Sequence, residues 1–526
     1  MSFSTERAAW IAGVALAIAY VFTLCAFTPL TLQDSPAHLE NAIALADLIF
    51  HGGEHFGGMF SYHFLFVPYV LGDLGFAASV EAFGPDAGSA VWMSFVFLSL
   101  PLALVFFMRV AGVAADRRAL IFIVSLYLAT DWFFLMGFLS FRLGLAVTIA
   151  NLALAIRLRN GWSSRTYVGY CALVVMGYLV HLTTIALLTP AIAASAPLRL
   201  WRRTSNVRTE AFLITPLATL WAWHFWAMHL YTRPDDPVEN PYVWGTLYGK
   251  FAGLGYEFVR YHLNWDLLMM GALVICLIAS AAGTRARDLR AFAVLEMALL
   301  AATFVVVYLI LPQGYSEAWY VDVRALALAS VCALLAFAYL PAARSWLRVP
   351  AIVLAVGLVT TNLIYLQRHL ARGQTWLTQY RAVVAAIPSG ARVLPVTTRS
   401  RGGNIAPSRH MHAFIAIDRG ALMPYAFNAD TANPEKYLRY VAKPYAPVEN
   451  WYLKGAWTSV DWRRVALDYD YLLIEKPFDA RHIPVQTRLV TENASAALFS
   501  IEKPWGQHRG CTAADMKRYP DLANKQ

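Results

Sequence analysis

Long apolar runs of about twenty residues recur along the first 367 positions, and each is long enough to cross a bilayer as a helix. After residue 367 these runs stop, and charged and turn-forming residues become frequent. The sequence therefore predicts a polytopic α-helical membrane domain at 1–367 and a second domain at 368–526. We expect about eleven transmembrane helices, at 8–29, 88–109, 119–137, 141–158, 166–180, 182–198, 210–230, 265–282, 291–311, 325–341 and 350–367.

The pattern beyond residue 367 predicts a small α/β domain. Segments 391–396, 469–474 and 497–501 are short and rich in strand-forming residues, and 374–387 is typical of a helix that ends before Pro388. About 150 residues suffice for a core of their own. The polar stretches Arg409–His412 and Asp430–Pro434 could bind an acceptor, but solvated loops are the favoured interpretation.

Charge is scarce and unevenly distributed. Only 14% of residues are charged, against about 25% in soluble proteins, and the net charge is +10. Sixteen basic residues fall in loops on one side of the predicted membrane: Arg7, Arg109, Arg117, Arg118, Arg157, Arg159, Arg165, Arg199, Arg202, Arg203, Arg208, Arg285, Arg287, Arg290, Arg344 and Arg348. The opposite loops hold five: Arg142, Arg233, Lys250, Arg260 and Arg324. This bias predicts a cytoplasmic N-terminus and an extracytoplasmic C-terminal domain, in a bacterial inner membrane.

Residues 60–80 are apolar enough to be mistaken for another span. If they crossed the membrane, every later loop would change sides and the charge bias would be lost. Pro68, Gly72, Asp73 and Gly75 also disfavour a straight crossing helix. We therefore expect residues 30–87 to form one large outer loop with short interfacial helices.

Several classes of protein are excluded or disfavoured by motif. The chain has no basic nucleic-acid module, no nucleotide-binding glycine loop, no GxSxG and no HExxH. Four of its five Cys lie in apolar runs, so no disulfide framework is expected. The first run lacks a convincing cleavage site and is interpreted as a retained span. No cofactor is expected. The histidines of the first loop could bind a divalent metal. However, Gly52 and Gly53 argue against a helix that would align His51 with His55.

The stretch Gln33–Asn41, just after the first span, carries the main catalytic candidates. Asp34 and His38 are four residues apart, so a helix would place them on one side. A carboxylate beside an imidazole suits proton abstraction from a nucleophile. The alternative is that Asp34 only caps a helix starting at Ser35-Pro36.

Basic residues at the outer ends of spans are candidates for binding a phosphate. Arg142, Lys250, Arg260 and Arg324 run against the charge bias, and we expect one of them to contact a lipid-linked phosphate. The alternative is snorkelling, or an ion pair such as Asp322 with Arg324. Further substrate-binding candidates in the same outer loops are Glu40, His181 and Asp322.

The layout of the chain resembles that of the GT-C glycosyltransferases, which include protein O-mannosyltransferases and aminoarabinose transferases. The shared features are an acid, Asp34, near the start of a long first outer loop, segment 60–80 before the 88–109 span, and an outer soluble domain. The family's paired Asp-Glu is not present, because Ser35 follows Asp34. The resemblance implies transfer of a sugar from a polyprenyl-phosphate donor to a cell-envelope glycan, lipid or protein acceptor, with Asp34 as general base and His38 as its partner. It implies membrane lipid as surroundings and no nucleic-acid partner.

Two alternatives stay open at this stage. One is a non-catalytic transporter or assembly subunit for envelope polysaccharide, for which Glu296 is the clearest acid within a span. The other is an O-antigen-type polymerase or ligase.

Overall fold

The fold was examined in a computed structural model of the whole chain. The structure describes residues 3–231, 242–282, 284–315, 318–341, 345–397, 405–406, 409–426, 437–442, 444–447, 459–478 and 486–502. Asp430–Pro434 and Cys511 lie outside these ranges.

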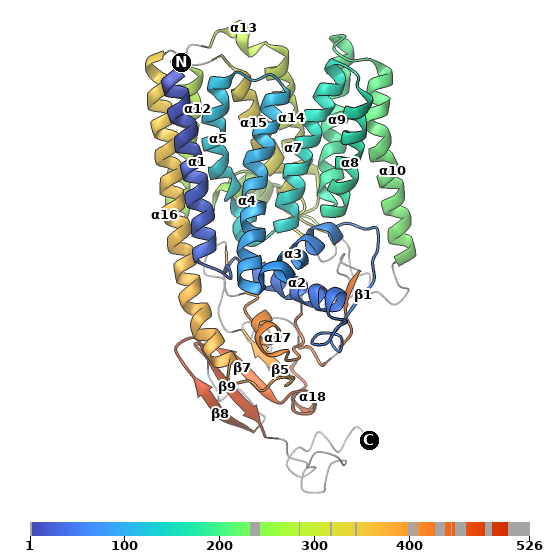
Figure 1. The fold of residues 1–526 in the computed structure, drawn as a ribbon, viewed down its shortest axis with the longest axis vertical. Coiled ribbons are helices and arrows are strands. Elements are labelled where there is room, and N and C mark those ends of the chain that lie inside the picture. Colours follow the sequence, from blue (N-terminus) through green and yellow to red (C-terminus); the bar gives the residue numbers. More distant parts are fainter. Residues whose placement is uncertain are drawn as a thin grey trace.

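An upright helical bundle forms most of the molecule (Figure 1). Each expected span overlaps one of its helices: α1 (Phe3–Ala26), α4 (Pro85–Val110), α5 (Ala115–Ala129), α7 (Leu139–Asn160), α8 (Ser164–Val180), α9 (Thr183–Trp201), α10 (Val207–Tyr231), α12 (Leu263–Ala281), α14 (Phe292–Ile310), α15 (Val323–Tyr339) and α16 (Ser345–Val384). Within the described ranges, eight helical segments are long and apolar enough to cross a membrane, and α12 and α15 are shorter apolar helices.

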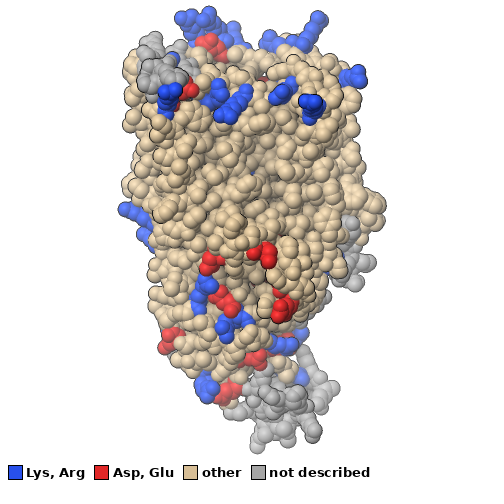
Figure 2. Space-filling model, in the orientation of Figure 1, with Lys and Arg blue, Asp and Glu red and all other residues tan. Residues whose placement is uncertain are grey.

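The two ends of the bundle differ in charge. The N-terminus lies at one end, and the C-terminal sheet lies beyond the other, here called the sheet end (Figure 1). Figure 2 shows Lys and Arg gathered near the N-terminus, a broad uncharged band across most of the visible face of the bundle, and mixed charges toward the sheet end. The uncharged band is the surface expected to face lipid.

Two shorter helices lie across the sheet end of the bundle (Figure 1). They are α2 (Ser35–Phe50) and α3 (Val70–Phe83), which pack on each other. Segment 60–80 therefore contains strand β1 (Phe60–Tyr62) and most of α3, which is only 14 residues long.

The C-terminal part forms a mixed sheet in the order β5-β7-β9-β8, with β5 (Val393–Val396) parallel to β7 (Tyr471–Glu475) and the other pairs antiparallel. The expected strands correspond to β5, β7 and β9 (Ala496–Ile501). Two helices accompany the sheet, α17 (Ala413–Arg419) and α18 (Trp462–Asp468). The edge strand β8 (Thr487–Glu492) was not predicted because its residues are mostly polar and partly exposed. Strand β6 (Leu438–Tyr440) instead pairs with β1 of the first loop.

Helix α16 joins the bundle to this sheet without a break. The span expected at 350–367 and the separate helix expected at 374–387 form one helix of 40 residues. No proline lies between the two segments, so nothing ends the helix there. Gly373 in this stretch allows close approach to Thr31, whose Oγ1 would lie 2.0 Å from a Cβ at this position.

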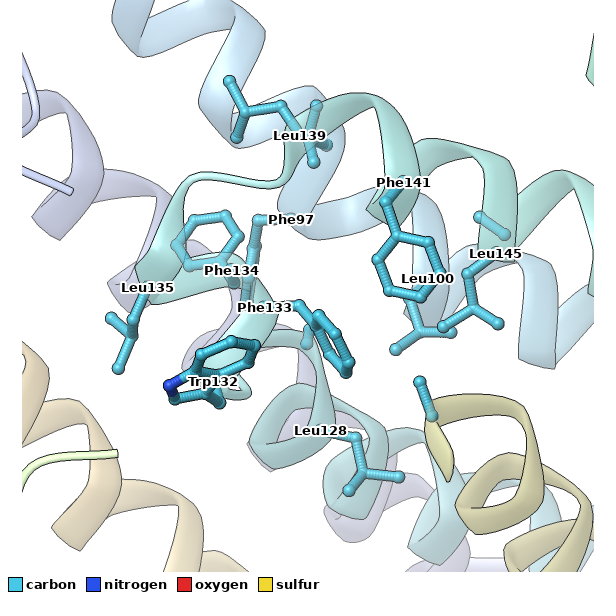
Figure 3. Close-up of a cluster of buried hydrophobic side chains, with 14 of the residues drawn as sticks. Phe97, Leu100, Leu128, Trp132, Phe133, Phe134, Leu135, Leu139, Phe141 and Leu145 are labelled. Carbon is cyan, nitrogen blue, oxygen red and sulfur yellow. The ribbon is translucent and has the colours of Figure 1, made fainter. Parts of the chain in front are cut away.

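The core beneath the sheet end is built around the short helix α6 (Trp132–Met136), between α5 and α7. Figure 3 shows Trp132, Phe133 and Phe134 among leucine and phenylalanine side chains of α4, α5 and α7. This packing gives the backbone of α6 a fixed position under the first loop. The remaining short elements are β2 (Tyr242–Val243), β3 (Gly314–Tyr315), β4 (Ala318–Trp319), α11 (Leu247–Ala252), a 3-10 helix (Gly253–Phe258) and α13 (Ala286–Leu289).

Glu296, the acid that favoured a transporter, belongs to a buried ion-pair network. Arg199 binds both of its carboxylate oxygens, at 2.5 and 2.6 Å. Arg159 binds Glu210 in the same way, at 2.9 and 2.6 Å, and lies 3.8 Å from Glu296. The network joins α7, α9, α10 and α14, so Glu296 serves to hold helices together.

Candidate functional site

The backbone of Asp34 is held directly on α6. The amide of Gln33 donates to the carbonyl of Leu135 at 3.1 Å, and the amide of Asp34 donates to that of Met136 at 3.0 Å. Gly137 follows with φ +84°, and a Cβ there would lie 3.0 Å from the Asp34 nitrogen. A glycine is therefore needed both for the left-handed turn and for this close approach.

Helix α2 begins immediately after Asp34 but does not use its carboxylate as a cap. Asp34 occupies the N-cap position, yet its side chain accepts no capping hydrogen bond from the described residues. Ser35 organises the turn instead, since its hydroxyl donates to the carbonyl of Leu30 at 2.5 Å and accepts from the Leu32 amide at 3.1 Å. The geometry does not support the capping interpretation and leaves the carboxylate available for chemistry.

The carboxylate of Asp34 meets a histidine from the C-terminal domain. Nε2 of His410 lies 3.4 Å from Asp34 Oδ1, and both side chains are 12% exposed. Burial alone would raise the pKa of this carboxyl, but the hydrogen bond from His410, with smaller contributions from His38 and Arg409, holds the pKa below its ordinary value. Asp34 is thus an ionised, largely buried carboxylate, as a general base requires.

His38 lies one helical turn beyond Asp34, and its amide donates to the Asp34 carbonyl at 3.1 Å. Burial lowers the pKa of His38 to about 4, despite the opposing effect of Asp34. The ring is therefore neutral at pH 7, so it can accept or relay a proton but adds no positive charge.

His410 was missed from the sequence, where Arg409–His412 was interpreted as a solvated loop. The segment is anchored on the first loop, because the Ala406 amide donates to Gln33 Oε1 at 2.9 Å. His412 is buried and its Nε2 lies 3.2 Å from the Tyr425 carbonyl. The apolar run Ala413–Ile415 directly after the histidines was the available signal that this loop packs inward.

Two of the four candidate cations are neutralised by buried carboxylates. Arg142 donates to Asp131 at 2.5 Å and to the Leu128 carbonyl at 3.1 Å. Lys250 pairs with Asp322, so the suggested pair of Asp322 with Arg324 does not form. In both pairs each side chain is at most 6% exposed, so neither cation faces a ligand site.

Arg260 is buried, 2% exposed, and stacks on Tyr127 with its Cζ 3.9 Å from the ring centre. Its Nη1 donates to the Tyr127 carbonyl and to Asn362 Oδ1, at 3.0 and 3.2 Å. The nearby carboxyl of Asp266 accepts three backbone hydrogen bonds, one of them from the Arg260 amide. These contacts are those of a cation that fixes a loop on the bundle.

Arg324, at the start of α15, has different surroundings. Among the described residues no carboxylate forms an ion pair with it, and its guanidinium lies 5.4 Å from the Phe138 ring and 5.7 Å from the Phe141 ring. It interacts with the Tyr69 hydroxyl. Like Arg260, Arg324 therefore makes aromatic contacts and forms no ion pair with a described carboxylate.

His181 connects Arg324 to the Asp34 region. It lies in the turn between α8 and α9 and interacts electrostatically with both His38 and Arg324. Its ring packs edge-on against Tyr69, with ring centres 4.6 Å apart. Tyr69 has φ +75°, which is rare for a residue with a side chain and is often found at functional sites.

Glu40 is separated from this row of side chains. It is 1% exposed on α2, and burial raises its pKa well above the ordinary value. Its Oε2 forms no hydrogen bond to a described residue. Burial thus favours the protonated form of Glu40. Within the described ranges, no group of three or more His, Cys, Asp and Glu side chains is arranged to hold a metal ion.

The fold is similar to that of a solved structure, ArnT from Cupriavidus metallidurans in the apo state, and the expectation of a GT-C-like fold is confirmed. It matches with a TM-score of 0.56 and 12% sequence identity over 93% of this chain and 97% of that one. No family model and no curated protein matches the sequence. The chain is thus an integral membrane protein with a GT-C-like fold.

Proposed function

We propose that this protein is a membrane glycosyltransferase that moves a sugar from a polyprenyl-phosphate donor to a hydroxyl of a cell-envelope glycan, lipid or protein. The observation that carries the proposal is the Asp34 carboxylate: it is ionised, makes no capping hydrogen bond with a described residue, contacts His410 and interacts electrostatically with His38. The GT-C-like fold supports a lipid-linked donor, and the neighbour ArnT is a transferase of this class.

In the proposed step, Asp34 removes the proton of the acceptor hydroxyl as its oxygen attacks the anomeric carbon. A new carbon–oxygen bond forms to the acceptor, and the bond between the anomeric carbon and the phosphate oxygen breaks. The electron pair of that bond leaves with the phosphate, so polyprenyl phosphate is released. The leaving group gains negative charge, which a nearby cation stabilises.

Arg324 is the cation we assign to that phosphate. Arg142 and Lys250 are neutralised by buried carboxylates, and Arg260 is held by Tyr127 and Asn362. Neither Arg260 nor Arg324 forms an ion pair with a described carboxylate, and Arg324 is the one that interacts with His181, which also interacts with His38. A guanidinium in such surroundings suits paired hydrogen bonds to a phosphate.

We place the sheet end outside the cytoplasm, in a bacterial inner membrane, because basic residues gather at the opposite end of the bundle (Figure 2). The acceptor then approaches from the outer side, where α2, α3 and the C-terminal domain lie. The C-terminal domain completes the site rather than performing the transfer alone. The transporter alternative loses its main support, since Glu296 is neutralised by Arg199.

The test uses purified full-length protein in vesicles with a panel of polyprenyl-phosphate sugars, and follows release of polyprenyl phosphate. Asp34→Asn should keep its expression and melting temperature but lose about 10²–10⁴-fold in rate. The matched control is Asp461→Asn, because Asp461 is a true N-cap that accepts from the Arg464 amide at 3.2 Å. Turnover by Asp34→Asn at the rate of this control would refute the general-base assignment.

A further inference from the structure

We propose that His410 is a positioning residue for Asp34, so that the site is complete only when segment 409–412 of the C-terminal domain is docked on the loop before α2. This inference rests on the proposed function and extends it, because it assigns part of the site to a domain that otherwise contains no candidate for the transfer chemistry.

The contact itself is specific. His410 Nε2 lies 3.4 Å from Asp34 Oδ1, inside a site where both side chains are 12% exposed. A carboxylate with this little water around it needs a partner to stay ionised and to hold one rotamer. His410 engages Oδ1, so in the proposed step Oδ2 is the oxygen that takes the acceptor's proton.

The remaining charged and titratable groups around this pair come from three directions. His38 approaches from α2, while Arg409 and His412 flank His410 in its own segment. His181 interacts electrostatically with His38 and with Arg324. His38 is neutral at pH 7, so it adds no positive charge there. The hydrogen bond that stabilises the ionised form of Asp34 comes from His410.

The fold holds the segment that carries His410 on both sides of this residue in the chain. Before it in the chain, the Ala406 amide donates to Gln33, which is the residue next to Asp34. After it, α17 packs against α2 and is fixed to α16 by Arg381, which binds both carboxylate oxygens of Asp418, at 2.8 and 2.7 Å. His410 therefore lies on a segment that is fixed by contacts before and after it in the chain. A histidine held in this way can keep the Asp34 carboxylate in one position.

The experiment compares His410→Ala, His410→Gln and wild type for kcat, for KM toward a short-chain polyprenyl-phosphate sugar, and for the rate–pH profile. His63→Ala is the matched control, because His63 is an exposed histidine at the sheet end that contacts other residues through its backbone. His410→Ala should lower kcat about ten- to a hundredfold with little change in KM, because a hydrogen bond to a charged group is lost.

The rate–pH profile separates positioning from mere structural support. Loss of the hydrogen bond raises the pKa of Asp34, so the acidic limb of the profile should move upward by about one pH unit. His410→Gln keeps an N–H donor and should recover part of both kcat and the position of the limb. His63→Ala should match wild type.

Three results would overturn the inference. If Asp34→Asn is inactive while His410→Ala keeps the wild-type kcat and acidic limb, His410 does not position Asp34 and the proposed function stands. If His410→Ala does not fold, His410→Gln is the variant to measure. A folded His410→Gln enzyme that is slow, but whose rate–pH profile keeps its acidic limb at the wild-type position, would show that His410 gives structural support alone. An active Asp34→Asn enzyme removes the general base, and the inference falls with it.

Discussion

Lys250 and Asp322 form a buried ion pair between two loops at the sheet end of the bundle. The ammonium also donates to the carbonyls of Tyr308 and Leu311, at 3.0 and 2.7 Å. Lys250 therefore has an oxygen partner for each of its three N–H groups. This arrangement distinguishes Lys250 from Arg324. Arg324 comes two residues after Asp322 in the sequence but forms no ion pair with a described carboxylate.

The two cations should respond differently to alanine substitution. Arg324→Ala should weaken binding of a short-chain polyprenyl phosphate about ten- to a hundredfold and leave the melting temperature nearly unchanged, because it removes a ligand contact. Lys250→Ala should instead cost about 3–5 kcal/mol of stability, because Asp322 is left buried and unpaired. Binding titration and thermal unfolding in detergent measure both. Equal donor affinity for wild type and Arg324→Ala would move the phosphate site elsewhere.

Gly137→Ala should damage both stability and turnover. The new methyl group would lie 2.9 Å from the Ser35 nitrogen and 3.0 Å from that of Asp34, so the loop must shift. Gly112→Ala is the control, because Gly112 has φ +72° but nothing within 4 Å of its Cβ position. Both variants pay the cost of a left-handed residue, about 1 kcal/mol, and only Gly137→Ala should also lose kcat. Equal kcat in the two variants would show that the contact with α6 does not position Asp34.

Glu40 should make stability depend on pH. Its pKa is raised in the folded protein, so the folded state binds the proton more tightly than the unfolded state does. The free energy of unfolding should therefore fall as pH rises above about 4.3, the ordinary pKa of a glutamate. Glu40→Gln should remove this loss and raise the melting temperature at pH 7–8. Glu54→Gln, at an exposed position, should leave the pH dependence as in wild type. Identical curves for the two variants would contradict the burial of Glu40.

Glu296→Gln should destabilise the bundle strongly. The substitution leaves Arg199 without its carboxylate inside the network, which typically costs about 3–5 kcal/mol. The comparison is Glu492→Gln, which breaks the exposed pair with Lys476 at 2.6 Å and should cost at most about 1 kcal/mol. Thermal unfolding in detergent measures the difference. A Glu296→Gln protein as stable as the control would reopen a functional role for this acid.

Membrane orientation can be tested with single cysteines. In a background without reactive native cysteines, Asp86→Cys and Arg202→Cys should be labelled from opposite sides. Asp86 is exposed in the first turn of α4 and Arg202 is exposed just after α9, at opposite ends of the bundle. Position 86 should react with an impermeant maleimide added outside the cell. Labelling of position 86 from the cytoplasm alone would invert the proposed topology.

The sequence was sufficient for the layout but not for the pairing of charges. Apolar runs of membrane length directly reveal the spans, so the helices and the GT-C-like fold could be predicted. The partner of Arg142 could not, because Asp131 was hidden within an apolar run expected to be a span. His410 was missed for the same reason: which loop of one domain meets a residue of the other depends on tertiary packing, and local pattern carries no information about it.

Helix α16 is longer than the membrane is thick. Its 40 residues measure about 60 Å, roughly twice the thickness of the hydrocarbon layer, so about half of the helix stands outside the bilayer. The sheet and α17 are attached to that projecting half, which sets the height of His410 above the lipid. One inserted residue in the projecting half would lift the domain by about 1.5 Å and turn it by about 100°. The length of this helix therefore sets how far from the membrane the C-terminal sheet and His410 lie.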